Sequence, residues 1–145
     1  MQNIELLKSL TQTTYDSVQG YTDAAQKADA GALKTALEQR RDKRSQTLSM
    51  MNRALIDNGG EAVTSTSASR KAHAAWTGLT DAISSGDKAV VERIEEGEDH
   101  LKSEFKDALD DDARTEPELR RVIEKAYTEI QEGERFTDML EKKYA

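Results

Sequence analysis

One acidic residue of the chain takes a position that its neighbours mark as interior. Glu98 lies one helical turn from Ile94 and one turn from Leu101, on the face that these apolar residues share. An isolated ion is very costly to bury, so a glutamate at this position has to be paired or protonated. Arg44 takes a similar interior position at a similar height in an earlier segment. We therefore expect Arg44 and Glu98 to meet in a buried or half-buried ion pair.

Each of the long segments with this spacing becomes polar near its own midpoint. Hydroxyl, guanidinium, carboxylate and phenol groups can satisfy one another there, which is the condition for burying polar side chains. The expected polar layer in the middle of the molecule consists of Thr14, Arg41, Arg44, Glu98 and Tyr127. Arg41 is placed beside Arg44 because residues three apart share a helix face.

Carboxylates in the middle of a helical bundle are also the ligands of dinuclear iron and manganese sites. Such sites take a Glu from each of two helices and a Glu-x-x-His motif from each of the other two. The chain has two histidines, His73 and His100, and the residues three positions before them are Arg70 and Gly97. Neither histidine completes the motif, so we expect no metal, no cofactor and no catalytic residue. A mononuclear site using Glu96 and His100, one turn apart, is the alternative.

The polar layer depends on long amphipathic helices to bring its residues together. Apolar or small residues recur in steps of three and four, which is the period of a helix face and not of a strand. The expected long helices cover residues 3–28, 31–57, 88–111 and 116–143, with a short extra helix over 69–84. The sequence therefore predicts an all-α fold, with residues 1–145 forming one helical-bundle domain.

Capping residues and connection lengths indicate how the helices are joined. Asp29 is expected to cap the second long helix, the Asn-Gly-Gly run at 58–60 to end it, and Asp87 to cap the third. Short connections make the first two long helices antiparallel, and likewise the last two. The connection over 58–87 is long enough to cross the whole bundle. This favours a ferritin-like four-helix bundle with an up-down-down-up order, while a simple up-and-down order stays open.

Composition and charge limit the classes of protein. The 145 residues include no cysteine, which excludes a disulfide scaffold, a cysteine nucleophile and thiolate metal sites. The formal net charge is −7, and an acidic surface repels phosphate, so nucleic acid is not an expected partner. The basic run over 40–44 lies within a helical pattern, and we expect it to act inside the molecule. No apolar stretch suits a membrane span and no signal peptide is apparent, which favours a cytoplasmic protein.

The expected short helix carries a candidate interaction surface formed by His73 and Trp76, which lie one turn apart. Packing of this helix against the bundle explains the two residues without a partner. An adaptor protein would instead use Trp76 to dock one. A homo-oligomer also stays open, because bundle seams and dimer interfaces use the same residue types.

The whole chain resembles an uncharacterised, mostly proteobacterial family of ferritin-like four-helix-bundle proteins. The resemblance rests on residues 15–25, on His-Ala-Ala-Trp-Thr-Gly-Leu at 73–79, and on Glu-Glu-Gly-Glu-Asp at 95–99 ahead of Phe105. It implies a fold related to ferritins and a bacterial cytoplasm, but no activity. Relatives in that superfamily are often iron proteins or stress-induced proteins.

Three functions follow from these observations. The sequence favours a non-enzymatic, soluble helical bundle with a stress-related or interaction role. The alternative is a degenerate ferritin-like metal-binding bundle with iron-handling or oxidase activity. The third is the adaptor that docks a partner through the short helix.

Overall fold

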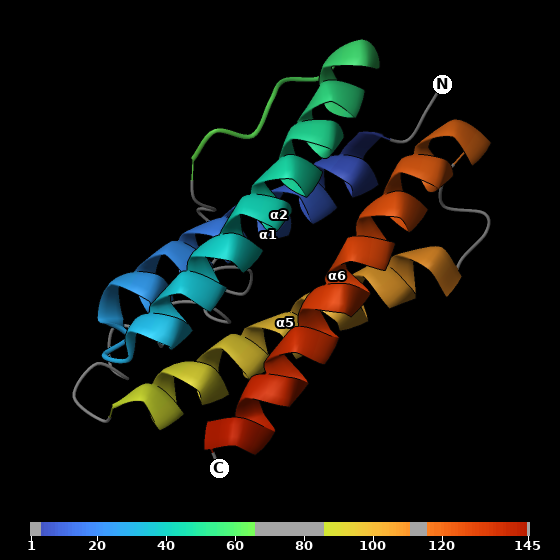
Figure 1. Cartoon of the computed structure of the whole chain (residues 1–145). Coiled ribbons are helices and arrows are strands. Elements are labelled where there is room, and N and C mark those ends of the chain that lie inside the picture. The colour runs from blue at the N-terminus through green and yellow to red at the C-terminus, as the bar shows by residue number, and fades with distance from the viewer. Residues whose placement is uncertain (1–3, 66–85, 111–115, 145) are drawn as a thin grey trace.

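The computed structural model describes residues 4–65, 86–110 and 116–144, and these contain four α-helices and no strand. The helices, labelled as in Figure 1, are α1 (Ile4–Lys27), α2 (Gly31–Asp57), α5 (Asp87–Asp110) and α6 (Pro117–Tyr144). An all-α four-helix bundle is thereby confirmed for the described residues. Each of these helices begins and ends within one residue of its expected bounds. The expected short helix over 69–84, with His73 and Trp76, lies outside the described residues.

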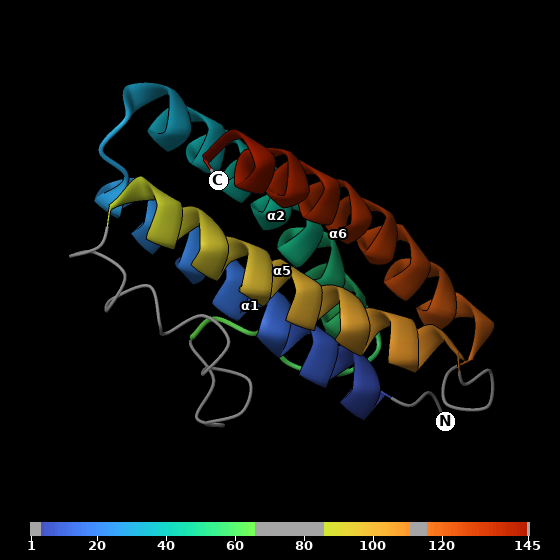
Figure 2. The same ribbon diagram turned by 90° about the horizontal axis from the view of Figure 1, so that it is seen from below.

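The four helices lie side by side along one another's length. α1 packs against α2 and α5, and α6 packs against α5 and α2 (Figure 2). α1 and α2 run in opposite directions, as do α5 and α6 (Figure 1). α5 begins at the end of the bundle where α2 also begins, so these two helices run in the same direction. The order of directions along the chain is therefore up, down, down, up.

The interior is one cluster of apolar side chains interrupted by charge. Its largest fully buried apolar members are Leu7, Tyr21, Leu33, Leu37, Met51, Leu55, Ile94, Leu101, Phe105 and Leu119. Burial of such side chains is worth about 1.5–3 kcal/mol each and holds the helices together. In the middle of the bundle the cluster gives way to an arginine and a glutamate that are both fully buried. None of the described helices has an apolar stretch long enough to cross a membrane.

Helix α2 ends at the Asn-Gly-Gly run, as its sequence indicates. The side-chain amide of Asn58 donates a hydrogen bond to the carbonyl of Ala54 at 2.8 Å, and the N–H of Gly60 donates to the carbonyl of Leu55 at 2.8 Å. Between them Gly59 has a φ of 86°, a conformation that favours glycine. The last carbonyls of α2 are thereby satisfied within the turn that ends it.

The turn between α1 and α2 is held by a residue from α5. The carboxylate of Asp87 accepts hydrogen bonds from the backbone N–H groups of Asp29 and Ala30, at 2.7 and 3.0 Å. The prediction that Asp29 caps α2 is wrong, because the N-cap residue is Ala30, which has no polar side chain. The prediction that Asp87 caps α5 is also wrong: Asp87 is the first residue of α5, and its carboxylate reaches across the bundle. The start of α5 is thereby fixed to the α1–α2 turn.

Replacing Asp87 by alanine is expected to lower the free energy of unfolding by about 1–3 kcal/mol, because two charge-assisted hydrogen bonds to backbone N–H groups are lost. Asparagine should retain part of the stability, since it keeps one acceptor oxygen. Urea unfolding followed by circular dichroism measures both changes. Glu92→Ala, on the exposed face of α5, is the matched control. Equal stability of Asp87→Ala and Glu92→Ala would contradict this role of Asp87.

Candidate functional site

A fully buried ion pair lies in the middle of the bundle. The side chains of Arg44 on α2 and Glu98 on α5 are both 0% exposed. Two parallel hydrogen bonds join them, from Nη1 to Oε1 and from Nη2 to Oε2, each 2.7 Å long. This two-pronged geometry is the strongest form of an arginine–carboxylate contact. The structure thus brings together the two residues whose charge and interior spacing stand out in the sequence.

Two further N–H groups and the face of the Arg44 guanidinium are also used. Its Nε donates to Oε1 of Glu129 on α6 at 2.8 Å, and Nη1 donates to the hydroxyl of Ser17 on α1 at 3.0 Å. Ser17 in turn donates to the backbone carbonyl of Thr14 at 2.7 Å. The guanidinium carbon lies 5.7 Å from the ring centre of Tyr21, within the range of a cation–π contact. All four helices therefore contribute to the surroundings of one arginine.

A second arginine completes the balance of charge. Arg40, one turn before Arg44, forms an ion pair with the carboxylate of Glu129. The same Arg40 nitrogen also donates to the backbone carbonyl of Glu129 at 3.0 Å. We call Arg40, Arg44, Glu98 and Glu129 the ion layer. Two positive and two negative charges meet in it, so neither sign is left uncompensated within the layer.

A glycine on α6 provides the space for the ion pair. A Cβ at Gly133 would lie 2.6 Å from Nη2 of Arg44 and 3.3 Å from Cδ of Glu98, and it would overlap Oε2 of Glu98. Glycine in a helix interior costs about 1 kcal/mol relative to alanine. At this position the missing side chain lets the backbone of α6 pass directly over the carboxylate.

Burial and neighbouring charges act in opposite directions on these groups. Burial by itself would raise the pKa of Glu129, but the charge of Arg44 and the hydrogen bonds from Arg44 and Arg40 lower that pKa below its ordinary value. Burial would lower the pKa of Arg44, whereas the Glu98 carboxylate raises it well above its ordinary value. Burial and the charge of Glu98 raise the pKa of Tyr21. Arg44 and Glu129 are therefore charged at neutral pH, and the Tyr21 phenol is protonated.

The lowered pKa of Glu129 predicts how the protein responds to acid. A carboxyl group whose pKa is lower in the folded state stabilises the fold above its unfolded pKa of about 4.3, and this contribution is lost as the pH falls through the folded value. Glu129→Gln is expected to cost about 1–3 kcal/mol at neutral pH. It should also weaken the loss of stability as the pH falls below about 5. Urea unfolding at several pH values measures this, with the exposed neighbour Glu132→Gln as control; identical acid profiles for Glu129→Gln and wild type would rule out the effect.

Arg41, expected beside Arg44, lies outside the ion layer, and Arg40 takes its place. The Arg41 side chain is 30% exposed and pairs with the adjacent Asp42, with 2.9 Å between Nη2 and Oδ1. Arg40 is buried. The prediction was wrong in register, because the inward position after Leu37 falls three residues on and not four.

Thr14 and Tyr127 are also placed outside the ion layer. Thr14 is buried, but its hydroxyl donates to the backbone carbonyl of Leu10 at 2.7 Å and lies 3.6 Å from the sulfur of Met51, so it contacts no charged group of the layer. The hydroxyl that reaches Arg44 belongs to Ser17, one turn further along α1. Tyr127 is half-buried and lies one position off the inward face of α6. Both residues flank the middle of the bundle without joining its charges.

The alternative mononuclear pair, Glu96 and His100, is not brought together. Glu96 accepts a hydrogen bond from Nη1 of Arg93 at 2.9 Å, and His100 pairs with Glu104 on its other side. Glu104 is itself half-buried, and this burial raises its pKa in spite of the neighbouring histidine. Each residue of the alternative pair thus has a different partner on α5.

Carboxylates that could hold a metal ion gather on the outer side of α5 and α6. Among the described residues they form two overlapping groups: Glu95, Asp138 and Glu141, and Asp99, Glu134 and Asp138. Burial and the charges of Glu134 and Asp138 raise the pKa of Asp99, and burial together with Glu134 raises that of Asp138. The Nζ of Lys102 already donates to Glu134 at 3.0 Å. A cation of the protein itself therefore occupies the edge of these groups.

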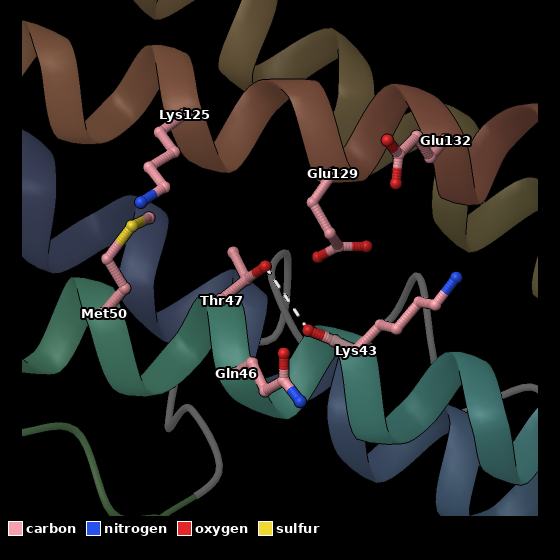
Figure 3. A pocket seen from close by; sticks show the side chains of 7 residues that line it. All are labelled: Lys43, Gln46, Thr47, Met50, Lys125, Glu129 and Glu132. Atoms are coloured by element: carbon pink, nitrogen blue, oxygen red, sulfur yellow. Dashed lines mark hydrogen bonds between the residues drawn. The ribbon is translucent and has the colours of Figure 1, made fainter.

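Glu129 links the ion layer to an open hollow between α2 and α6 (Figure 3). The hollow has a volume of about 420 Å³ and is lined by Lys43, Gln46, Thr47, Met50, Lys125, Glu129 and Glu132. Figure 3 shows Glu129 between Lys125 and Glu132 on α6, with its carboxylate directed towards α2. The Glu129 side chain is 15% exposed, so one edge of the ion layer faces solvent.

Residues 2–111 match the family described as Domain of unknown function (DUF2383). The chain belongs to this family. The expected membership of an uncharacterised family is thus confirmed. No curated protein and no solved structure matches the chain significantly. The DUF2383 match covers α1, α2 and α5 with Ser17, Arg44 and Glu98, whereas Glu129 and Gly133 lie beyond it.

Proposed function

We propose that this DUF2383 protein is a non-enzymatic, ferritin-like bundle with an interaction role, in which the ion layer takes the place of a metal centre. The observation that carries the proposal is the two-pronged bond between Arg44 and Glu98 at the midpoint of the bundle. In ferritin-like proteins this is the region where carboxylates and histidines from facing helices hold two metal ions. Here the region holds a salt bridge between two of the facing helices.

The order of helix directions supports the ferritin-like part of the proposal. α2 and α5 run in the same direction. In a ferritin-like bundle the second and third helices are also parallel, and one long crossover connects them. A bacterial cytoplasm and a stress-related role belong to the same proposal, and they rest on the resemblance to ferritin-like proteins alone.

The donor set of the ion layer does not fit a dinuclear metal centre. Both oxygens of Glu98 accept hydrogen bonds from Arg44, and both oxygens of Glu129 are held by Arg44 and Arg40. A metal ion would have to displace a guanidinium group to reach either carboxylate. The two positive charges would also repel it at close range in a medium of low dielectric constant. The chemistry that remains is charge neutralisation, which stabilises one arrangement of the helices.

Metal analysis of the full chain tests the proposal. The protein is purified without chelator, incubated with Fe²⁺ or Mn²⁺ without oxygen, desalted and analysed for bound metal. We expect substoichiometric metal in the wild type and no change in Glu98→Gln. Stoichiometric iron or manganese that disappears in Glu98→Gln but not in Glu132→Gln would overturn the proposal and support a degenerate metal-binding bundle.

A further inference from the structure

A second hollow continues the one beside Glu129 along the cleft between α2 and α6. Its volume is about 330 Å³, and it is lined by Ala36, Gln39, Arg40, Asp42, Lys43 and Phe136. Lys43 borders both hollows. Each is within the size range of small-molecule sites. We call the smaller one the Phe136 hollow.

A buried donor without an acceptor borders the Phe136 hollow. Arg40 is 6% exposed, and one of its terminal nitrogens is bound to Glu129. Its Nε, in contrast, is buried and has no hydrogen-bond partner among the described residues. A buried N–H group of a cation is costly to leave without an acceptor. An acceptor oxygen brought by a ligand would remove this cost once the Arg40 side chain turns its buried Nε towards the hollow.

The charges around the Phe136 hollow favour an anion. Asp42 is neutralised by Arg41, whose Nε and Nη2 donate to it at 3.1 and 2.9 Å. Arg40 is balanced within the ion layer, so the exposed amine of Lys43 leaves this hollow with a positive charge in excess. Of the two helices that border the hollow, α2 contains six Lys or Arg against three Asp or Glu, and α6 contains six against seven. Arg40 and Arg44 are balanced in the ion layer, so the attraction for an anion comes mainly from Lys43.

The same hollow offers an apolar surface. Phe136 on α6 is half-buried and packs against the hydrophobic core with one side, while it lines the hollow together with Ala36 on α2. Aromatic side chains that border a cleft supply most of the contact area for flat or aliphatic ligand groups. The lining of the hollow thus offers cationic groups for an acidic group and an apolar surface for the rest of a ligand.

We propose that the Phe136 hollow binds a small organic anion, whose acidic oxygens contact Arg40 and Lys43 and whose apolar part lies against Phe136. This goes beyond the proposed function, which concerns the ion layer and its metal content. Binding here leaves the Arg44–Glu98 pair intact, because the anion meets only the outer arginine of the layer.

Titration of ¹⁵N-labelled full-length protein with 2-naphthoate, followed by NMR, tests the proposal. We expect saturable shift changes at residues 36–43 and around Phe136, with a dissociation constant of about 1 mM or below, as suits a ligand of this size. The neutral analogue 2-naphthalenemethanol should bind at least about 10-fold more weakly, since it lacks the charge that Arg40 and Lys43 recognise.

Two variants locate the site. Lys43→Gln is expected to weaken 2-naphthoate binding about 3-fold or more, and Phe136→Ala about 5-fold or more. Lys34→Gln, exposed on the same helix outside the hollow, is the matched control. The proposal is overturned if the shift changes map elsewhere or are absent, if the alcohol binds as tightly as the carboxylate, or if Lys43→Gln and Lys34→Gln behave alike. None of these outcomes bears on the metal content, so the proposed function is tested separately.

Discussion

Replacing Arg44 by methionine is expected to lower the free energy of unfolding by about 3–5 kcal/mol, because it leaves a fully buried carboxylate without its partner. Glu98 accepts both of its strongest hydrogen bonds from Arg44 and is 0% exposed, so water cannot take the place of the guanidinium. Methionine keeps the aliphatic character of the arginine stem but does not fill the space of the guanidinium group. The loss therefore combines the unpaired charge with a term for incompletely filled space. Urea unfolding followed by circular dichroism measures it.

A double-mutant cycle separates the pair from its surroundings. Glu98→Gln is expected to cost less than Arg44→Met, about 1–3 kcal/mol, because the amide keeps one acceptor for Arg44. The single variant Glu98→Met closes the cycle with Arg44→Met, and the double variant of these two substitutions should recover much of the loss, since two apolar side chains replace a neutral pair. The exposed Arg53, paired only with Asp57 one turn away, supplies the control Arg53→Met. Near-zero effects of Arg44→Met and Glu98→Gln would show that the layer is solvated.

A cycle of this kind also bears on what the layer is for. If the double variant is as stable as the wild type, the ion layer adds little net stability, as is common for buried pairs. Its value would then lie in selecting one register of four similar helices, because only one alignment places Arg44, Glu98 and Gly133 at the same height. Whether a four-helix bundle with apolar replacements keeps this alignment can be followed by the dispersion of its NMR spectrum.

The helices and the central pair could be predicted from the sequence, because both depend on spacing alone. Steps of three and four residues define the inward face of each helix, and Glu98 takes one of its positions. The C-terminal end of α2 follows an equally local signal, the Asn-Gly-Gly run. The residues on the inward face of a helix can thus be predicted from spacing. A charged residue on that face is recognised because its neighbours there are apolar.

The other residues around the central pair could not be predicted from residue spacing. Arg40 and Arg41 are adjacent and chemically identical, so composition gives no reason to prefer a step of three over a step of four after Leu37. Glu129 lies beside the inward face of α6, where a glutamate is ordinarily solvated, and only the packing of α6 against α2 brings it to Arg44. Ser17 and Thr14 lie about one turn apart on α1, and both are buried, so spacing does not decide which of the two hydroxyls reaches Arg44.

Asp87 illustrates the same limit at the end of the bundle. An aspartate before a helical segment indicates a cap for that segment, which is a local interaction. Here its carboxylate binds backbone N–H groups more than fifty residues away. Such contacts follow from the relative placement of helices, and this is decided by the whole core.

Replacing Gly133 by alanine is expected to destabilise the protein by about 2–4 kcal/mol, against the usual preference of helices for alanine. The added Cβ would lie 2.6 Å from Nη2 of Arg44 and would overlap Oε2 of Glu98. Neither group can turn aside without breaking the two-pronged bond, and no space for it exists inside the close-packed core. Either α6 moves outward along its length or the ion pair opens, and both cost more than the roughly 1 kcal/mol that alanine gains in a helix.

Gly31→Ala is the matched control for this prediction. A Cβ at Gly31, the first residue of α2, meets nothing within 4 Å, so this variant should be neutral or slightly stabilising. A companion variant tests whether the ion pair itself requires the glycine. In the background Arg44→Met with Glu98→Met, the Gly133→Ala substitution should lose most of its cost, because flexible thioether side chains can yield where a fixed ion pair cannot. A cost for Gly133→Ala that is the same in both backgrounds would mean that backbone packing of α6, and not the ion layer, requires the glycine.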